Sequence, residues 1–319
     1  NSGTITIKDG TQIGQSAIAM QLERGSATYT QAGQLINSGN IIIESTSKNV
    51  QGSTGGVGVF VSIAPVVNPV LIKPGKISIT GDGNRAVEVG SDVFGANNYV
   101  SSNIIVDGSG GQITLQGTKN TGLYISRAAS STGNSIADNI KNMNILIDGT
   151  NTPAISRETQ NASEKSMDLK INGTLLQSVE FGANSLQSAV VNISYGNAII
   201  ESSLANSLVP INTGKQNALF VGSYNTMIKN YMPINIGTGA QGMMGIVTNG
   251  SFENYADIVN NSSKYVYTYT SSWGSTTYNY GSVGLALNNY IVTNPVNGNV
   301  ASTGLNMGNI DMNGDYATG

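Results

Sequence analysis

Gly3-Thr4-Ile5-Thr6-Ile7 is the first of four short segments in which a glycine precedes alternating polar and apolar residues. The other three are Gly39-Asn40-Ile41-Ile42-Ile43, Gly75-Lys76-Ile77-Ser78-Ile79 and Gly111-Gln112-Ile113-Thr114-Leu115. Consecutive glycines of this set lie 36 residues apart (39−3, 75−39 and 111−75). A fixed period of this length is typical of proteins built from stacked repeats. The pattern therefore predicts a stacked array, whose function would lie on its surface and in its insertions.

Two further apolar segments follow the opening strand in each period. One has a small residue followed by apolar, variable and apolar positions, and it occurs at residues 17–20, 58–61, 86–89, 122–125 and 154–156. The other precedes the next glycine, at residues 35–36, 70–72 and 104–106. Alternation with a period of two buries one face of a strand. Three strands per turn predict an all-β, three-sided solenoid with loop insertions, in which Ile5 and Ile7 stack under Ile41 and Ile43.

Later segments of the same kind come at shorter intervals. They are Met143-Asn144-Ile145-Leu146-Ile147, Met167-Asp168-Leu169-Lys170-Ile171 and Ala189-Val190-Val191-Asn192-Ile193. We interpret them as successive coils of about 24 and 22 residues (167−143 and 189−167), which would make the long loops of the first half insertions. Because no linker interrupts the pattern, residues 1–319 are predicted to be a single domain. Both ends fall inside strand patterns, so we expect a segment of a longer protein.

The composition excludes several classes of function. The net charge of −3 leaves no basic surface for nucleic acid, and the absence of Cys and His removes thiolate nucleophiles, the base of a serine-protease triad and the usual metal ligands. The longest apolar stretch, residues 57–72, is interrupted by Pro65 and Pro69 and is too short to span a bilayer. We therefore predict no catalytic residues, no metal, no cofactor and no membrane insertion.

The segments Asn1-Ser2-Gly3-Thr4-Ile5-Thr6-Ile7 and Asn37-Ser38-Gly39-Asn40-Ile41-Ile42-Ile43 carry a resemblance to a known family. With the small-apolar strand that follows each, they resemble the passengers of type V autotransporters, and more narrowly the large adhesins of anaerobic Gram-negative bacteria. Filamentous haemagglutinins of two-partner secretion share the pattern. The resemblance implies a right-handed parallel β-helix that is secreted or held at the bacterial outer surface. It also implies adhesion to a host-cell glycoprotein or glycan, or to the surface of another bacterium.

The segment 264–282 differs from the rest of the chain because it is rich in aromatic residues. Alternating tyrosines on either side of the single tryptophan predict a projecting β-hairpin with one aromatic face. Such faces are favoured at interfaces, because the rings give a large, rigid contact area with a polar tip. The candidate contact residues are Tyr265, Tyr267, Tyr269, Trp273, Tyr278 and Tyr280. The alternative is that cross-strand tyrosine pairs only stabilise the hairpin.

Other segments offer weaker candidates. The Pro-punctuated apolar segment 62–74 either forms a partner site or folds onto the coil, and the loops 126–141 and 157–166 either carry contacts or are simply solvated. Gly81-Asp82-Gly83-Asn84 has too few carboxylates for a calcium loop.

The alternative function is a polysaccharide-binding or -cleaving β-helix of the tailspike or lyase kind. Asp and Glu are scattered singly, whereas glycoside hydrolysis needs a carboxylate pair, so we expect no enzyme.

Overall fold

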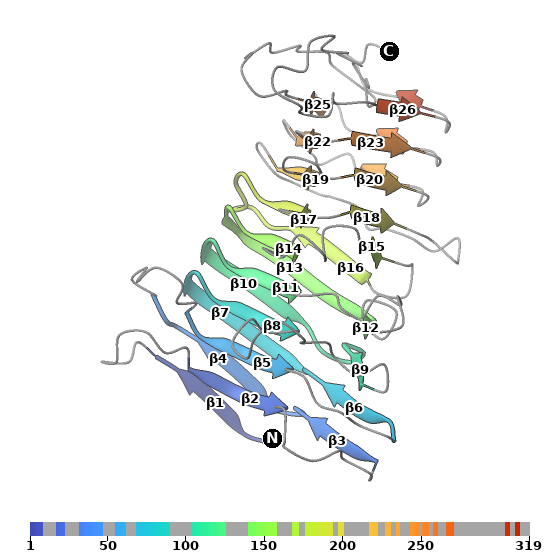
Figure 1. Cartoon of the computed structure of the whole chain (residues 1–319). Coiled ribbons are helices and arrows are strands. Elements are labelled where there is room, and N and C mark those ends of the chain that lie inside the picture. Colours follow the sequence, from blue (N-terminus) through green and yellow to red (C-terminus); the bar gives the residue numbers. More distant parts are fainter. Residues whose placement is uncertain are drawn as a thin grey trace, which may run out of the picture.

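The chain folds into stacked coils of β-strand in the computed structural model (Figure 1). The structure describes residues 1–8, 17–22, 32–46, 55–61, 68–89, 104–125, 140–157, 168–171, 176–193, 197–200, 217–222, 227–230, 234–236, 243–248, 251–254, 258–260, 266–270, 304–306 and 310–312. Every regular element in these residues is a strand, and they contain no helix long and apolar enough to cross a membrane. The predicted all-β fold is confirmed.

Three sheets share the N-terminal coils. Sheet 1 contains β1 (Thr4–Ile7), β4 (Asn40–Ile43), β7 (Lys76–Asp82), β10 (Ile113–Thr118), β13 (Met143–Thr150) and β16 (Leu176–Phe181). Sheet 2 contains β2 (Ile18–Leu22), β5 (Val57–Val61), β8 (Arg85–Val89), β11 (Thr121–Ile125), β14 (Pro153–Arg157), β17 (Ala189–Ile193), β19 (Ala218–Gly222), β22 (Met243–Thr248) and β25 (Val266–Thr270). Sheet 3 contains β3 (Gly33–Ile36), β6 (Val70–Lys73), β9 (Ile104–Asp107) and β12 (Ile140–Lys141).

Two further sheets belong to the later coils. Sheet 4 contains β15 (Asp168–Ile171), β18 (Asn197–Ile200), β20 (Met227–Asn230), β23 (Ser251–Asn254) and β26 (Gly304–Asn306). Sheet 5 contains β21 (Ile234–Ile236), β24 (Ile258–Asn260) and β27 (Ile310–Met312). Neighbouring strands pair in parallel in all five sheets. Each of the first four coils gives one strand to each of sheets 1, 2 and 3, which confirms the three-sided solenoid.

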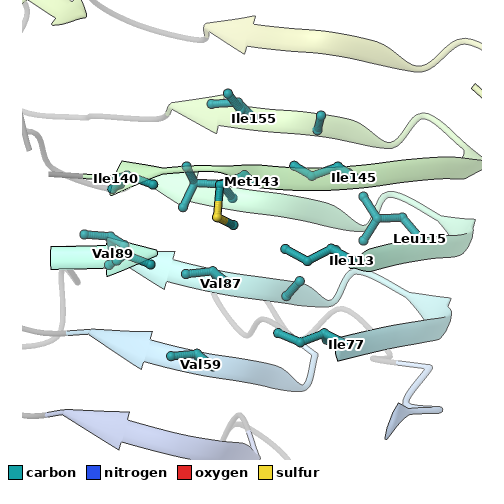
Figure 2. Close-up of a cluster of buried hydrophobic side chains, with 14 of the residues drawn as sticks. Val59, Ile77, Val87, Val89, Ile113, Leu115, Ile140, Met143, Ile145 and Ile155 are labelled. Carbon is teal, nitrogen blue, oxygen red and sulfur yellow. The ribbon is translucent and has the colours of Figure 1, made fainter. Parts of the chain in front are cut away.

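The core is a set of apolar columns that run through the stack. Ile5 lies opposite Ile41, which lies opposite Ile77 and then Ile113, as the sequence predicts. Figure 2 shows Ile77, Ile113 and Ile145 one above the other, with Val59 and Val87 of sheet 2 in the same cluster. Ile41, Ile43, Ile77 and Ile79 are closed to solvent. Full burial of such a side chain contributes about 1.5–3 kcal/mol, so the columns are the main source of stability.

Glycines at the corner before sheet 1 pack backbone against backbone. A Cβ added to Gly39 would collide with the carbonyl oxygen of Gly3, and one added to Gly111 would collide with that of Gly75. Gly75 also has a φ of +67°, a conformation that L side chains rarely adopt. The repeated glycine therefore reflects the close approach of successive coils at this corner.

The structure corrects the predicted shortening of the coils. The segments at 143, 168 and 189 are not successive coils, because β13, β15 and β17 belong to sheets 1, 4 and 2. The register gives coils of 32 residues from Leu123 to Ile155 and 36 from Ile155 to Val191. Later sheet 2 partners are closer, with 29, 26 and 22 residues between Val191, Phe220, Ile246 and Thr268. The prediction was wrong because the strands on every side of the coil carry the same alternating apolar pattern, so the pattern does not show which sheet a strand joins.

A column of buried polar residues lies at the corner between sheets 1 and 2. Each member immediately precedes a strand of sheet 2, and the members are Asn84, Asn120, Thr152, Ser188 and Asn217, all at most 2% exposed. Asn84 Oδ1 accepts from Gly56 N at 2.7 Å, and Asn120 Oδ1 accepts from Asn84 N at 2.9 Å. Ser188 Oγ accepts from Thr152 N at 3.0 Å, and Asn217 Oδ1 accepts from Ser188 N at 2.9 Å. This corner ladder satisfies backbone N–H groups that would otherwise be buried without a partner.

Candidate functional site

One column of sheet 2 brings together aromatic, charged and polar side chains. Phe60, Glu88, Tyr124, Ser156 and Asn192 lie opposite one another on consecutive strands, and we call this set the Tyr124 column. The same register position begins at Gln21 on β2 and continues through Val221 and Val247 to Tyr269 on β25. The parallel register therefore connects residues that are far apart in the sequence.

The Tyr124 column lies on the side of sheet 2 that faces away from the core. Val87 and Val89 flank Glu88 and belong to the core cluster, whereas Glu88 does not. Phe60 and Tyr124 are also buried, and neither belongs to that cluster. Because successive side chains of a strand point to opposite faces, these residues occupy the outer face. Phe60 and Glu88 are nevertheless only 6% exposed, so this outer face is shielded from solvent at β5 and β8, whereas Asn192 on β17 is half-buried.

Arg85, Glu88 and Tyr124 form the most polar contact of this face. Arg85 Nη1 lies 3.0 Å from Glu88 Oε1, and the side chains are 17% and 7% exposed. The Arg85 guanidinium carbon also lies 3.3 Å from the centre of the Tyr124 ring. A desolvated cation–π contact contributes about 2 kcal/mol, and loss of one partner of a buried ion pair costs about 3–5 kcal/mol. The cluster therefore acts as a clamp between β8 and β11.

The sequence predicts the strands at 86–89 and 122–125, but it does not predict the clamp between them. One feature of the sequence could have indicated that Glu88 and Tyr124 are neighbours. They are separated by 36 residues, the same period as the repeated glycines. Arg85 carries no such signal. It precedes the apolar pattern of its strand, and its contact with Tyr124 depends on the coil-to-coil register.

The structure describes two of the six predicted contact residues. Tyr267 and Tyr269 lie on β25, which pairs in parallel with β22 and is therefore a strand of the solenoid. Tyr269 takes the position of the Tyr124 column, and Tyr267 lies opposite Met244. Tyr265, Trp273, Tyr278 and Tyr280 lie outside the described residues, as does the return arm of the hairpin. The hairpin at 264–282 thus stays a prediction, with its first arm belonging to sheet 2.

The outer face of sheet 1 differs from that of sheet 2 because it is open to solvent. On β7 exposed and buried residues alternate, with Lys76, Ser78, Thr80 and Asp82 exposed. Gln112, just before β10, and Gln116 on β10 are exposed, and Thr114 is half-buried. The outer positions of β1, β4, β7, β10 and β13, together with the adjoining Lys8, Glu44 and Gln112, form a face rich in hydroxyl and amide groups, which we call the polar strip.

The remaining sequence expectations concern metal binding, which is not predicted, and the segments 62–74, 81–84, 126–141 and 157–166. Within the described residues no group of three or more His, Cys, Asp and Glu side chains could hold a metal ion. In the segment 81–84, Asp82 Oδ1 accepts from Thr118 N at 2.9 Å, and Asn84 belongs to the corner ladder. Val70 and Ile72 of the segment 62–74 are buried in sheet 3, while residues 62–67 lie outside the described part. The loop residues 126–139 and 158–166 also lie outside it.

The fold defines a class of protein, the parallel β-solenoids, by its stacked three-strand coils and continuous apolar columns. No protein-family model matches the chain, and comparisons with curated proteins and with solved structures gave no match.

Proposed function

We propose that this chain is a non-enzymatic segment of a secreted or surface-held bacterial adhesin, in which the solenoid serves as stalk and display scaffold. The observation that carries the proposal is the ladder of nine parallel strands in sheet 2. At about 4.8 Å per strand, its eight steps extend for about 38 Å. A stacked array with a continuous core keeps its two ends at a fixed separation, which is what a stalk requires.

In this proposal the contact with a partner is made by the segment 264–282, which contains β25 and which we call the Tyr-rich segment. This strand is at the opposite end of sheet 2 from β2, so the stack would hold the segment away from the N-terminal coils. Tyr267 and Tyr269 supply rigid rings with a polar tip, which suit a protein surface or the face of a sugar. The partner would be a host-cell glycoprotein or glycan, or the surface of another bacterium.

The experiment compares adhesion of beads coated with the purified chain and with two variants. Tyr267→Ala/Trp273→Ala/Tyr278→Ala removes three rings, whereas Gln34→Ala/Ser109→Ala alters exposed residues elsewhere and serves as the control. We expect wild-type and control beads to bind epithelial cells or bacteria, and the triple variant to lose most of this binding with an unchanged β-sheet circular-dichroism signal. Equal adhesion of all three chains would remove the Tyr-rich segment as the contact.

A second assay addresses the enzyme alternative directly. The wild-type chain is incubated with a panel of plant, bacterial and host polysaccharides, and new reducing ends are measured. The proposal expects no cleavage. Reducing ends that appear in proportion to the amount of protein would replace the stalk with a polysaccharide-cleaving solenoid.

A further inference from the structure

We infer that the polar strip of sheet 1 is a binding surface for an extended, uncharged oligosaccharide that lies lengthwise across the coils. This site goes beyond the proposed adhesin function, and it uses a different face from the Tyr124 column. Over five strands the strip extends for about 19 Å, which matches an extended oligosaccharide better than a single sugar.

The polar strip is more accessible to solvent than the outer face of sheet 2 at β5 and β8. Four residues on the outer face of β7 are exposed, whereas Phe60 and Glu88 on the outer face of sheet 2 are 6% exposed. In sheet 1 the exposed positions continue on the next coil, where Gln112, just before β10, and Gln116 lie on the same face. Among the described residues of these two sheets, the polar strip therefore offers the larger surface to a soluble ligand.

The side chains of the strip form three columns that differ in length and chemistry and cross all five coils, and a shorter fourth column of Asp82, Thr118 and Thr150 lies beside them. The middle column contains short or aliphatic side chains, and the register places Thr6, Ile42, Ser78, Thr114 and Leu146 in it. The two flanking columns contain mostly longer polar side chains, including Asn40, Lys76, Gln112 and Asn144 on one side and Glu44, Gln116 and Asp148 on the other. The methyl groups in the middle suit the C–H face of a pyranose ring, and the flanking amides and carboxylates can pair with its hydroxyls.

Hydrogen bonds hold the second flanking column in place before any ligand arrives. Asp148 Oδ1 accepts from Asn184 N at 2.8 Å, and Asp148 Oδ2 accepts from Asn184 Nδ2 at 3.1 Å. Gln116 Nε2 lies 3.5 Å from the same Oδ2, and Lys8 Nζ lies 3.5 Å from Glu44 Oε2. Because these side chains already have partners, less conformational entropy is lost when a ligand binds.

The charges of the strip favour an uncharged ligand. Over the outer positions of the strip the charged residues are Lys8, Lys76, Glu44, Asp82 and Asp148, two cations and three anions that are interspersed over the coils. A polyanion or polycation would meet like charges on at least one coil, which is destabilising. A neutral polyhydroxyl chain meets hydrogen-bonding groups on every coil and no charge repulsion.

The test is affinity electrophoresis of the whole chain in gels that contain one polymer each. The neutral probes are dextran, mannan, xyloglucan and mixed-linkage β-glucan, and the charged controls are heparin and polygalacturonate. Gln112→Ala/Gln116→Ala removes two exposed flanking amides, and Thr114→Arg places a long charged side chain in the middle column. Gln34→Ala, on sheet 3, is the matched control, and Tyr267→Ala reports on the Tyr-rich segment.

We expect at least one neutral polymer to retard the wild-type chain, Gln34→Ala and Tyr267→Ala equally. Loss of two hydrogen bonds should weaken this binding by about tenfold to thirtyfold in Gln112→Ala/Gln116→Ala. Thr114→Arg should weaken it at least as much, and unchanged urea midpoints would confirm that both variants fold. The inference is overturned if no neutral polymer retards the wild-type chain, if the strip variants bind as well as Gln34→Ala, or if only charged polymers bind. Loss of binding in Tyr267→Ala alone would assign the sugar to the Tyr-rich segment instead.

Discussion

Single buried asparagines are central to the stacking of this chain. Asn120 makes four hydrogen bonds from a fully buried position, since its Oδ1 accepts from the backbone N and side-chain Nδ2 of Asn84. Its own Nδ2 donates to the carbonyl oxygens of Gly81 and Gln116, both at 2.6 Å. An amide fits this corner because it satisfies donors and acceptors of two successive coils at once.

Replacement of Asn120 by alanine should therefore destabilise the fold by about 3 kcal/mol, because buried backbone groups lose their partners. The measurement is the urea midpoint at constant m-value. Asn184→Ala is the control, since Asn184 is an exposed asparagine whose bonds to Asp148 lie at the surface, and it should cost less than about 1 kcal/mol. Equal effects of the two substitutions would show that the ladder does not depend on its side chains.

Asp107 makes stability depend on pH in the acid range. Burial by itself would raise the pKa of this carboxyl, but hydrogen bonds from the Asn142 side chain and from Ser109, with the nearby charge of Lys141, hold its pKa below the ordinary value. A carboxyl with a lowered folded-state pKa binds protons more readily when unfolded. Its contribution is therefore complete above the unfolded-state pKa and is lost as the pH falls through the folded-state pKa.

We expect Asp107→Asn to be less stable than wild type at neutral pH, and this difference to shrink as the pH falls below about 4. Urea midpoints of both chains between pH 7 and pH 2.5 measure it. A stability difference that does not change with pH would mean that the Asp107 charge plays no part in its hydrogen bonds to Asn142 and Ser109.

At the corners between strands, Gly75 and Gly110 allow two effects on the free energy of unfolding to be compared. One is the positive-φ backbone conformation, and the other is the close packing of successive coils. Gly75 and Gly110 have similar positive φ values, +67° and +75°. A Cβ on Gly75 would collide with the carbonyl oxygen of Asn37, whereas one on Gly110 would meet nothing within 4 Å.

Gly110→Ala should cost about 1 kcal/mol, the usual penalty for a side chain in this conformation. Gly75→Ala should cost at least about 2 kcal/mol more, because β4 and β7 must also move apart. Thermal and urea unfolding of the two variants give the comparison. If both substitutions lower the free energy of unfolding by the same amount, the glycine period would reflect only the backbone conformation at the corner.

The sequence was sufficient to place most strands of the first four coils. Ile5, Ile41 and Ile77 alternate with polar residues and follow a glycine at a constant spacing, so their stacking could be predicted. The corner ladder could not be predicted from the sequence. Its members change from Asn84 and Asn120 to Thr152 and Ser188, and such residues are common in this chain. Only the register identifies them as one column.

The order of the later coils and the candidate site needed the three-dimensional register for the same reason. β15 and β17 carry similar alternating patterns yet belong to different sheets, so the sequence cannot distinguish a new coil from a new face. Arg85 and Tyr124 meet on adjacent coils, and no local pattern links the two residues. The Tyr-rich segment was recognisable from its composition alone, and its connection to the Tyr124 column through Tyr269 came from the register.

In the molecule as a whole, the proposed stalk depends on parallel coils that stack along sheet 1 at one constant spacing (Figure 1). The chain has no cysteine, so pairs of introduced cysteines can carry spin labels without background. The middle column of the polar strip and its continuation onto β16 provide suitable sites, with Thr6 as the fixed position and Thr114, Leu146 and Glu180 as partners on β10, β13 and β16.

The most direct test is therefore the set of spin–spin distances for Thr6→Cys combined with Thr114→Cys, Leu146→Cys or Glu180→Cys. The stacked solenoid predicts backbone separations of about 14, 19 and 24 Å, with narrow distributions that increase by about 5 Å per coil. Distances that do not increase in this order, or broad distributions for all three pairs, would contradict the stacked architecture and with it the proposed stalk.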